Sequence, residues 1–447
     1  MSYFCTMESR KIAFHTLGCK LNFSETSSIA RQFREAGFVI SGFDEVADIY
    51  VIHSCTVTST AEKKSRAAIS QARRRNPSAR IAVIGCYSEL RAESLKKIEG
   101  VEWVLGNETK YQLPDLIVHS DNTPLPPCEA VPCHQNSAIK GHPVNFYPAY
   151  SSGDRTRTFL KIQDGCDHFC TYCAIPYARG RSRSASIAQT LSLARKAVEE
   201  GAKEIVLTGV NIGDFGKKNG ETLFDFLLAF EREAIAERLR ISSIEPELLT
   251  DEIIRLVSES KCLMPHFHIP LQSGSDEILK KMKRPYTREL FARKVHLIRQ
   301  IMPHACIAAD VITGFPGETE DEFGEGATFA GSLPISYLHV FPYSERPGTP
   351  ACKMEGRVSP AEKRRRAGYL HQVSVHLMEN FLESCRGLEA RVLFESDEND
   401  GFMSGFTENY IRVKTPFRPE FVNQIHTLKL LERDRAGNYL YTPVFNE

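Results

Sequence analysis

The stretch Asp164-Gly-Cys-Asp-His-Phe-Cys-Thr-Tyr-Cys173 follows a strand-like run and holds Cys166, Cys170 and Cys173 at the spacing C-x3-C-x2-C. Thiolates are soft ligands that suit iron–sulfur clusters. Three thiolates leave one iron of a 4Fe-4S cluster without a protein ligand, and such an iron can bind a substrate. The spacing therefore predicts a 4Fe-4S cluster with an open iron, held on a loop after a strand.

Two alternatives to an iron–sulfur cluster are open for this loop. Zinc sites also use C-x2-C pairs, and His168 could supply a fourth ligand. A structural disulfide is disfavoured because the chain has 13 cysteines, an odd number, and nothing marks it for an oxidising compartment. We favour the iron–sulfur cluster over both.

Length and charge limit the architecture and the partners. A chain of 447 residues exceeds the usual span of one domain, so we expect two or three domains. Lys+Arg and Asp+Glu both number 56, which argues against a uniformly basic surface, so a polyanionic partner must bind local basic patches. The start of the chain carries no apolar leader, and no run approaches the length of a membrane span. We expect a cytoplasmic protein without a membrane partner.

The first segment alternates between strands and helices, which is typical of a doubly wound parallel α/β domain. We predict that the helix over 24–35 has Ser24 as its N-cap. The predicted strands are 11–19, 48–55, 80–86 and 101–105, and the predicted helices are 24–35, 59–75, 88–98 and 108–117.

Each of the first three predicted strands ends in a cysteine, namely Cys19, Cys55 or Cys86. The carboxyl ends of parallel strands meet at one edge of a sheet, and ligands bind beyond that edge. We therefore expect these three thiolates to hold a second cluster, again with one open iron. The alternative is that each cysteine is a small apolar residue that packs a strand end.

The central segment repeats the alternation on a longer period, and six βα units predict a parallel barrel or part of one. Glycine-rich or polar loops follow the strands, where such a barrel keeps its active site. The predicted strands are 158–163, 204–208, 238–243, 266–271, 306–313 and 336–341, and the predicted helices are 186–200, 222–232, 250–260, 276–302, 319–332 and 359–383.

The last segment has short strands that fit a small β-barrel, predicted at 389–395, 401–414, 423–432 and 438–445. Its aromatic and cationic residues interleave in a pattern suited to stacking on bases and holding phosphates, although a barrel core with a solvated face explains it too. These residues are Phe402, Phe406, Tyr410, Arg412, Lys414, Phe417 and Arg418.

A proline-rich stretch before the central segment reads as a linker, in which Cys128 and Cys133 have an incidental role. We read Cys5, Cys262, Cys306, Cys352 and Cys385 as structural or surface residues.

With Tyr172 just before its last cysteine, the C-x3-C-x2-C loop resembles the signature of the radical S-adenosylmethionine (SAM) superfamily. Three spaced cysteines, this loop and a small terminal barrel, in this order, resemble the methylthiotransferase family over nearly the whole chain. The resemblance implies an N-terminal methylthiotransferase domain at 10–120, a linker at 121–155, a radical SAM core at 156–384 and an OB-like, RNA-binding TRAM domain at 385–447.

The resemblance also implies two 4Fe-4S clusters, one held by Cys166, Cys170 and Cys173 and an auxiliary one held by Cys19, Cys55 and Cys86. One SAM methylates a sulfur on the auxiliary cluster, and another yields the 5′-deoxyadenosyl radical that activates the acceptor carbon. We expect SAM contacts from Thr208, Gly209, Gln272, Ser273 and Gly314, and contacts to the SAM carboxylate or to tRNA from Arg179, Arg181 and Arg183.

Local sequence decides between branches of the family. Thr16-Leu-Gly-Cys-Lys-Leu-Asn22 and Arg240-Ile-Ser-Ser-Ile-Glu-Pro246 resemble the branch that acts on N6-threonylcarbamoyladenosine at position 37, in the anticodon stem-loop of tRNA. The isopentenyladenosine-37 and ribosomal-protein branches are the alternatives. A flavodoxin or ferredoxin is the expected electron donor. A non-catalytic, two-cluster electron-transfer protein is a rival of another class, but it has no use for open irons or for a barrel with glycine-rich loops.

Overall fold

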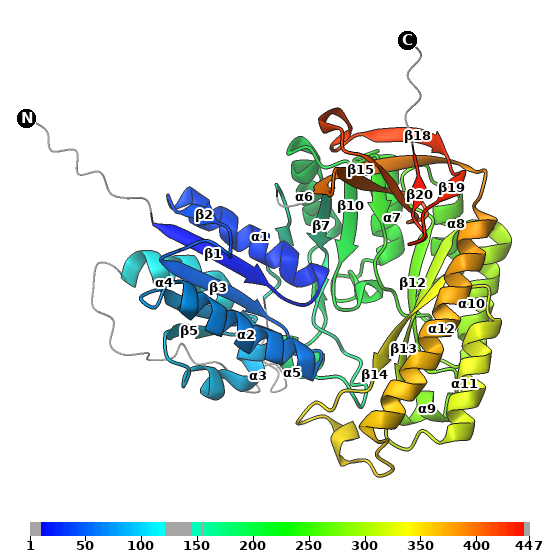
Figure 1. Cartoon of the computed structure of the whole chain (residues 1–447), viewed down its shortest axis with the longest axis horizontal. Coiled ribbons are helices and arrows are strands. Elements are labelled where there is room, and N and C mark those ends of the chain that lie inside the picture. Colours follow the sequence, from blue (N-terminus) through cyan, green and yellow to red (C-terminus); the bar gives the residue numbers. More distant parts are fainter. Residues whose placement is uncertain (1–9, 121–144, 154–155, 442–447) are drawn as a thin grey trace, which may run out of the picture. The chain divides into compact units, whose positions relative to one another are not determined.

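The computed structural model describes residues 10–120, 145–153 and 156–441. These fall into two compact units (Figure 1). Unit 1 comprises Met1–Ser151, Asp164–His168 and Cys173–Ser182, and unit 2 comprises Ser152–Gln163, Phe169–Tyr172 and Arg183–Glu447. The C-x3-C-x2-C loop therefore contributes its two flanks to unit 1 and its middle to unit 2.

Unit 1 is built on a five-stranded parallel sheet with the order β2-β1-β3-β4-β5. The strands are β1 (Lys11–Thr16), β2 (Val39–Ser41), β3 (Ile49–Ser54), β4 (Arg80–Gly85) and β5 (Val101–Leu105). The other elements of this unit are α1 (Lys20–Glu35), α2 (Ser59–Arg75), α3 (Cys86–Leu95), η1 (Thr109–Gln112), α4 (Leu113–Ser120), β6 (Ala149–Tyr150) and α5 (Ile175–Arg179).

Helices cover both faces of this sheet. As a result, every side chain of the central strand β3 is buried. Tyr50 and Ile52 belong to one hydrophobic core with Ile69 of α2. Val51 lies in the other core with Phe33 of α1. A strand that alternates between two cores reads as a continuous apolar run, and the predicted doubly wound domain is confirmed.

The start of α1 differs from the prediction. The helix begins at Lys20, its N-cap is Cys19, and Ser24 lies inside it, where its Oγ donates to the carbonyl of Leu21 (2.9 Å). No helix breaker stands between Cys19 and Ser24, so the helix extends back to the cysteine. The N-cap predicted at Ser24 was wrong, and the short edge strand β2 was not predicted.

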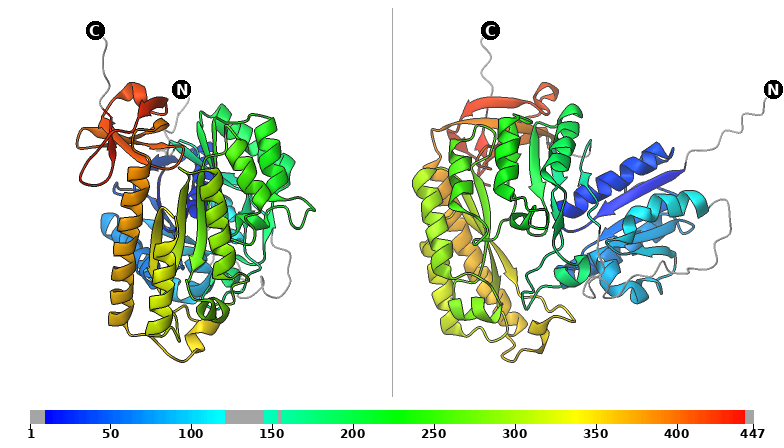
Figure 2. Two further views of the ribbon diagram at one scale, coloured as in Figure 1. Left: turned by 90° about the vertical axis from the view of Figure 1, so that its right-hand side faces the viewer. Right: turned by 180° about the vertical axis from the view of Figure 1, so that it is seen from behind.

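Unit 2 contains six parallel strands arranged as a partial (β/α)6 barrel (Figure 2). The strands of unit 2 in one sheet have the order β11-β10-β7, and those in the other have the order β12-β13-β14. The isolated bridges Leu239↔Leu263 and Ser243↔His268 connect the two sheets. The strands are β7 (Arg157–Lys161), β10 (Glu204–Thr208), β11 (Arg238–Arg240), β12 (His266–Gln272), β13 (Cys306–Thr313) and β14 (Tyr337–Pro342). Six strands were predicted at these places, so the fold class is confirmed.

Helices alternate with these strands, and long ones pack along the outside of β12, β13 and β14 in both views of Figure 2. The elements are β8 (Gln163–Asp164), β9 (Arg183–Ser184), α6 (Ile187–Glu199), η2 (Ile212–Asp214), α7 (Leu223–Arg232), α8 (Asp251–Glu259), α9 (Asp276–Lys281), α10 (Arg288–Ile301), α11 (Glu320–Ser332), η3 (Pro350–Lys353) and α12 (Pro360–Ser384). The helix predicted over 276–302 is divided in two, since Pro285 disfavours helical backbone at the residue before it.

The open edge of the barrel is closed by α12. Ser374 accepts a hydrogen bond from the Leu338 amide (2.9 Å) and donates one to the Leu338 carbonyl (3.0 Å). A hydroxyl thus takes the place of a neighbouring strand at the edge of β14.

The chain ends in a curled six-stranded sheet, here called the C-terminal sheet (residues 389–440), with the order β18-β15-β16-β17-β20-β19. The segment predicted as one strand over 401–414 is two antiparallel strands, because the chain turns at Tyr410, which has a positive φ of 66°. The elements are β15 (Glu389–Asn399), β16 (Phe402–Thr407), β17 (Arg412–Pro416), η4 (Pro419–Phe421), β18 (Ile425–Lys429), β19 (Glu432–Arg433) and β20 (Tyr439–Leu440).

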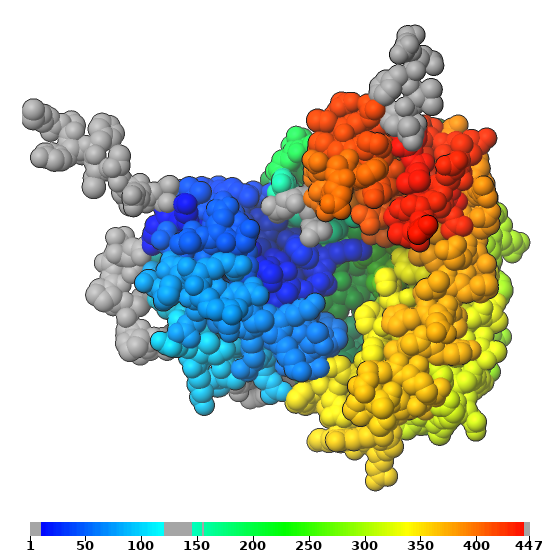
Figure 3. Space-filling view, viewed as in Figure 1, coloured from blue at the N-terminus to red at the C-terminus, as the bar shows by residue number. Residues whose placement is uncertain are grey.

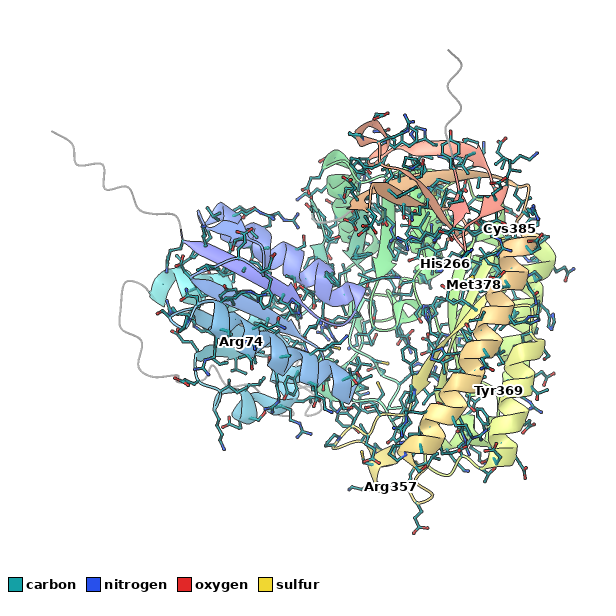
Figure 4. The ribbon with its side chains drawn as sticks, in the orientation of Figure 1. Arg74, His266, Arg357, Tyr369, Met378 and Cys385 are labelled. Atoms are coloured by element: carbon teal, nitrogen blue, oxygen red, sulfur yellow. The ribbon has the colours of Figure 1, made fainter. Side chains whose placement is uncertain are left out.

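The C-terminal sheet belongs to the same unit as the barrel and shares a core with the end of α12, and the atoms of the two form a continuous surface (Figure 3). Cys385 and Cys306 lie in this core, and His266 lies at the same junction (Figure 4). Arg238 and Arg240, both fully buried, form ion pairs with Glu204. The same two guanidinium groups donate to main-chain carbonyls of the C-terminal sheet at Arg391, Phe406, Thr407 and Glu408.

Within the described part of the chain, no helix is both long enough and apolar enough to cross a membrane.

Candidate functional site

Three cysteines of unit 1 lie beyond the carboxyl ends of three neighbouring strands. Cys19 precedes α1 in the turn after β1, Cys55 directly follows β3, and Cys86 is the first residue of α3 after β4. Gly18 packs so closely on Cys55 that a Cβ on this glycine would lie 2.8 Å from the sulfur. The three side chains share one edge of the sheet, as the strand pattern predicts.

Amide side chains lie against two of these sulfurs. The Asn107 Nδ2 donates to Cys86 Sγ (3.5 Å), and Asn22 lies 3.9 Å from Cys19 Sγ through its Oδ1. Burial, and to a smaller extent the neighbouring Cys86, raise the pKa of the Cys55 thiol to about 12. In the protein without bound metal this thiol is therefore protonated at neutral pH, and a metal that binds there must displace the proton.

A network of buried charged side chains lies next to the same three cysteines. The Arg179 guanidinium donates to both oxygens of Glu25 (3.2 and 3.1 Å), to Asn22 Oδ1 (2.6 Å) and to Asp164 Oδ1 (3.0 Å). Lys110 donates to Glu25 (2.5 Å) and to Asn107 Oδ1 (3.0 Å). The network thus reaches Cys19 and Cys86 through the two asparagines, and all of its charged members are buried.

Both flanks of the C-x3-C-x2-C loop belong to the same unit as this network. The Cys166 amide donates to the Gly180 carbonyl (3.0 Å), and the His168 amide donates to Cys166 Sγ (3.3 Å). Gly165 has a φ of +70°, and a Cβ there would lie 2.1 Å from the Arg181 carbonyl oxygen. Only glycine fits this close approach, so the loop geometry depends on Gly165.

The middle of the loop lies in unit 2. Cys170 is buried, and its sulfur accepts a hydrogen bond from Arg284 Nη1 (3.1 Å). Arg284 also forms an ion pair with Glu245 and donates to the Tyr286 hydroxyl (3.2 Å). Burial raises the pKa of the Cys170 thiol, and the charge of Arg284 opposes that effect. Arg284 therefore favours the thiolate that a metal needs.

Thr171 and Tyr172 fix the loop within unit 2. The Thr171 amide donates to the Met282 carbonyl (3.1 Å), and its carbonyl accepts from the Ala351 amide (2.8 Å). The Tyr172 ring packs edge-on against Phe315, with ring centroids 6.4 Å apart.

The residues predicted to contact SAM lie at carboxyl ends of the barrel strands. Thr208 ends β10, and Gly209 packs against Gln163, whose Oε1 accepts from the amides of Val210 and Asn211. Gln272 ends β12 with a positive φ of 61°, Ser273 Oγ accepts from the Ser275 amide, and Gly314 follows β13 with its amide bound to Glu318 (2.6 Å). The structure thus places all five at one end of the strands, and their contact with SAM stays a prediction.

The three predicted arginines lie in different environments. Arg179 is buried in the network of unit 1, whereas Arg181 is exposed and pairs with Asp167 at 3.5 Å. Arg183 is 9% exposed and lies in β9. Of the three, Arg181 is the one with a largely exposed side chain.

The aromatic pattern of the C-terminal sheet divides between inside and outside. Tyr410 stacks on Phe406 at 4.8 Å and lies tilted against the His266 ring at 4.8 Å. The Arg157 guanidinium lies over both Phe406 and Tyr410. These two rings pack against the barrel. Arg412 and Phe402 are exposed, and Lys414 lies 4.3 Å from the Phe402 ring centre.

Sequence reasoning missed several residues of these sites. Glu25, Lys110, Asn107 and Arg284 stand in ordinary helical or turn sequence, and their role depends on contacts between distant segments. Cys128 and Cys133 lie outside the described residues, as does Cys5. Cys306 and Cys385 are buried in the core, as a structural role predicts.

Comparisons with known proteins agree with this geometry. Residues 160–330 match the radical SAM superfamily, and residues 11–106 match a family described as uncharacterized protein family UPF0004. A radical SAM methyltransferase, TsrM from Kitasatospora setae, has a similar fold, with a TM-score of 0.54, 14% identity, and coverage of 89% of this chain and 80% of that chain.

Curated relatives match nearly the whole chain. The threonylcarbamoyladenosine tRNA methylthiotransferase MtaB of Bacillus subtilis is 38% identical over 94% of both chains. The protein of the same name from Aquifex aeolicus is 35% identical over 90% of this chain and 96% of its own. A tRNA-2-methylthio-N(6)-dimethylallyladenosine synthase from Syntrophus aciditrophicus is 30% identical over 90% of this chain and 86% of its own. Because the likeness to the MtaB proteins extends through both cysteine-bearing segments and almost to both ends, this chain belongs to the MtaB-type family of radical SAM methylthiotransferases.

Proposed function

We propose that this enzyme transfers a methylthio group to C2 of N6-threonylcarbamoyladenosine at position 37 of tRNA. The observation that carries the proposal is the 38% identity, over 94% of both chains, to a protein named for this nucleoside. Relatives named for dimethylallyladenosine are less similar, at 29% to 33% identity. Lys20 and Asn22, which belong to the same local sequence, support this branch.

The residues present fit two iron–sulfur clusters. Cys166, Cys170 and Cys173 would hold the radical SAM cluster, and Cys19, Cys55 and Cys86 would hold an auxiliary one. The fit rests on the donor set and on its surroundings: N–H groups of Arg284 and Asn107 point at Cys170 and Cys86. Such N–H···S hydrogen bonds stabilise thiolate ligands and tune a cluster. When bound, the clusters and two SAM molecules supply the sulfur, its methyl group and the radical that activates the carbon.

The chain's own residues orient and shield these groups. Arg284 holds the Cys170 sulfur and is itself fixed by Glu245 and Tyr286, so the middle of the loop keeps one position. Arg179 joins the start of the same loop, at Asp164, to Glu25 of the auxiliary domain. Low-dielectric surroundings strengthen both interactions.

Further parts of the proposal concern organisation and partners. We assign 10–120 to the methylthiotransferase domain, 121–155 to a linker, 156–384 to the radical SAM core and 385–447 to a TRAM domain. The exposed Arg181 and Arg412 and the partly exposed Lys414 are proposed to contact the anticodon stem-loop. A low-potential donor such as flavodoxin or ferredoxin would supply electrons in the cytoplasm.

The test is anaerobic incubation of the reconstituted enzyme with SAM, a reductant and tRNA that carries threonylcarbamoyladenosine. The nucleosides are then separated, and their masses are measured by mass spectrometry. The expected product is the methylthio form of that nucleoside, with tRNA that carries isopentenyladenosine as the matched control. Preferential reaction of isopentenyladenosine would contradict the proposed substrate.

A further inference from the structure

A cluster of three metal-ligating side chains lies in the barrel, apart from the cysteine sites. It consists of His268 on β12, Asp310 on β13 and His339 on β14. One ligand atom from each lies within 4.8 Å of the others. His268 Nε2 and Asp310 Oδ1 are 2.7 Å apart, and the two imidazole centroids are 5.2 Å apart.

The strand register explains why these side chains meet. Asp310 stands opposite His339 on the β13–β14 pair, and His268 stands opposite Ala308, two residues before Asp310, on the β12–β13 pair. Residues two apart on a strand share a face. The three side chains therefore share one face of three hydrogen-bonded strands, which is a more rigid support than a loop.

That face is turned toward the barrel interior. Cys306, four residues before Asp310, packs into the core beneath the C-terminal sheet. Ile312, two residues after Asp310, packs with Tyr172 of the C-x3-C-x2-C loop. Leu338, the residue before His339, points to the opposite face of the strand. Its backbone is hydrogen-bonded to Ser374 of α12. The side chains remain accessible there: His268 and Asp310 are 21% and 20% exposed, and His339 is exposed.

The charge of the cluster favours a cation. With neutral imidazoles the three side chains carry one negative charge, that of Asp310, whose carboxylate lies 2.7 Å from His268 Nε2. The Asp310 carboxylate would repel an anionic ligand and attract a metal ion.

We propose that His268, Asp310 and His339 bind one divalent first-row transition-metal ion, separate from both iron–sulfur clusters. Two imidazoles and one carboxylate are a donor set that zinc and ferrous iron accept, with other coordination positions left open. The ion replaces the proton shared between His268 and Asp310. Each ligand atom would need to lie within about 2.0–2.2 Å of the bound ion. The inference does not depend on which nucleoside the enzyme modifies.

The first experiment uses the full chain with the six cluster cysteines replaced by alanine, titrated with Co2+, whose visible spectrum distinguishes nitrogen and oxygen ligands from thiolates. About one equivalent should bind without a thiolate charge-transfer band, by the ligand set above. His268→Ala, Asp310→Asn and His339→Ala should each weaken binding at least ~100-fold, since each removes one of three ligands. His371→Ala on α12, an exposed histidine, is the matched control and should bind as before.

A second measurement covers the case in which the cysteine variant does not fold. Reconstituted wild-type protein is exposed to Zn2+, freed of excess metal and analysed for zinc and acid-labile sulfide. About one zinc should be retained beyond the cluster metal, and His339→Ala should lose it with sulfide unchanged. Retention of the zinc in a His268→Ala, His339→Ala double variant would overturn the proposal, as would failure of the wild type to retain any. In either case the three residues would be a hydrogen-bonded wall of the barrel.

Discussion

Arg179 donates two hydrogen bonds to the carboxylate of Glu25, and neither side chain is more than 3% exposed. Glu25 belongs to the helix that follows Cys19, and Arg179 ends the short helix that follows Cys173. A charge pair that water cannot screen therefore links the polypeptide next to both sets of cysteines.

Loss of Arg179 should destabilise unit 1. Removing one partner of a buried ion pair leaves an uncompensated charge, which costs about 3–5 kcal/mol. We expect Arg179→Met to lower the free energy of unfolding of the metal-free protein by this amount in urea denaturation. Arg179→Met combined with Glu25→Gln should cost less. The control is Arg181→Met, whose exposed pair with Asp167 should contribute less than about 1 kcal/mol. An equal loss in both arginine variants would contradict the assigned role.

The two cysteine sets should be separable by metal analysis. Wild-type protein should hold about eight irons and eight acid-labile sulfides, as two 4Fe-4S clusters require. Alanine at Cys166, Cys170 and Cys173 should halve both and abolish SAM cleavage. Alanine at Cys19, Cys55 and Cys86 should also halve both, yet 5′-deoxyadenosine should still form while no methylthio group reaches tRNA. Full sulfide content in either triple variant would disprove the ligand assignment.

The buried thiol of Cys55 predicts a pH dependence of the metal-free protein. Its folded-state pKa of about 12 lies above the ordinary value of 9.0, so folding favours the protonated thiol. This contribution to stability is fully present below pH 9 and is lost as the pH rises toward 12. The free energy of unfolding should therefore fall between pH 9 and pH 12 more steeply in the wild type than in Cys55→Ala. Parallel curves for the two proteins would show that Cys55 does not titrate in this way.

The C-terminal sheet should be needed for the barrel to fold. A chain that ends at Ser384 loses the carbonyls that bind Arg238 and Arg240 and uncovers the core around Cys306 and Phe381. Buried donors without acceptors cost about 1–3 kcal/mol each. We expect the truncated protein to lose cooperative unfolding by circular dichroism and to lose SAM cleavage. A truncated protein with normal SAM cleavage would contradict this expectation.

Binding of tRNA is better tested at Arg412, which is exposed, and Lys414, which is partly exposed, on the same sheet. Arg412→Ala with Lys414→Ala should weaken binding about 10-fold and reduce its salt dependence, because phosphate contacts release counterions. Lys429→Ala, exposed on β18, is the control. Filter binding at several salt concentrations gives both quantities. Unchanged affinity would move the tRNA contacts elsewhere.

Local sequence predicted the barrel and the doubly wound sheet because their periodicity is regular. Cys19, Cys55 and Cys86 could also be placed together, since parallel strands bring their carboxyl ends to one edge. The Arg179–Glu25–Lys110 network could not, because it joins residues as far apart as positions 25 and 179. The inward position of Tyr410 was hidden for the same reason: aromatic and cationic residues alternate in the same way whether they face RNA or Arg157.

The C-terminal sheet is held on the barrel through its backbone. Arg238 and Arg240 bind the carbonyls of residues 391, 406, 407 and 408 and not their side chains. Every amino acid offers the same carbonyl. Substitution of the Arg391 side chain, which is 41% exposed, therefore leaves its carbonyl acceptor in place as long as the strand keeps its course. Exposed side chains of the sheet can therefore diverge among relatives while the contacts that hold the sheet on the barrel are kept.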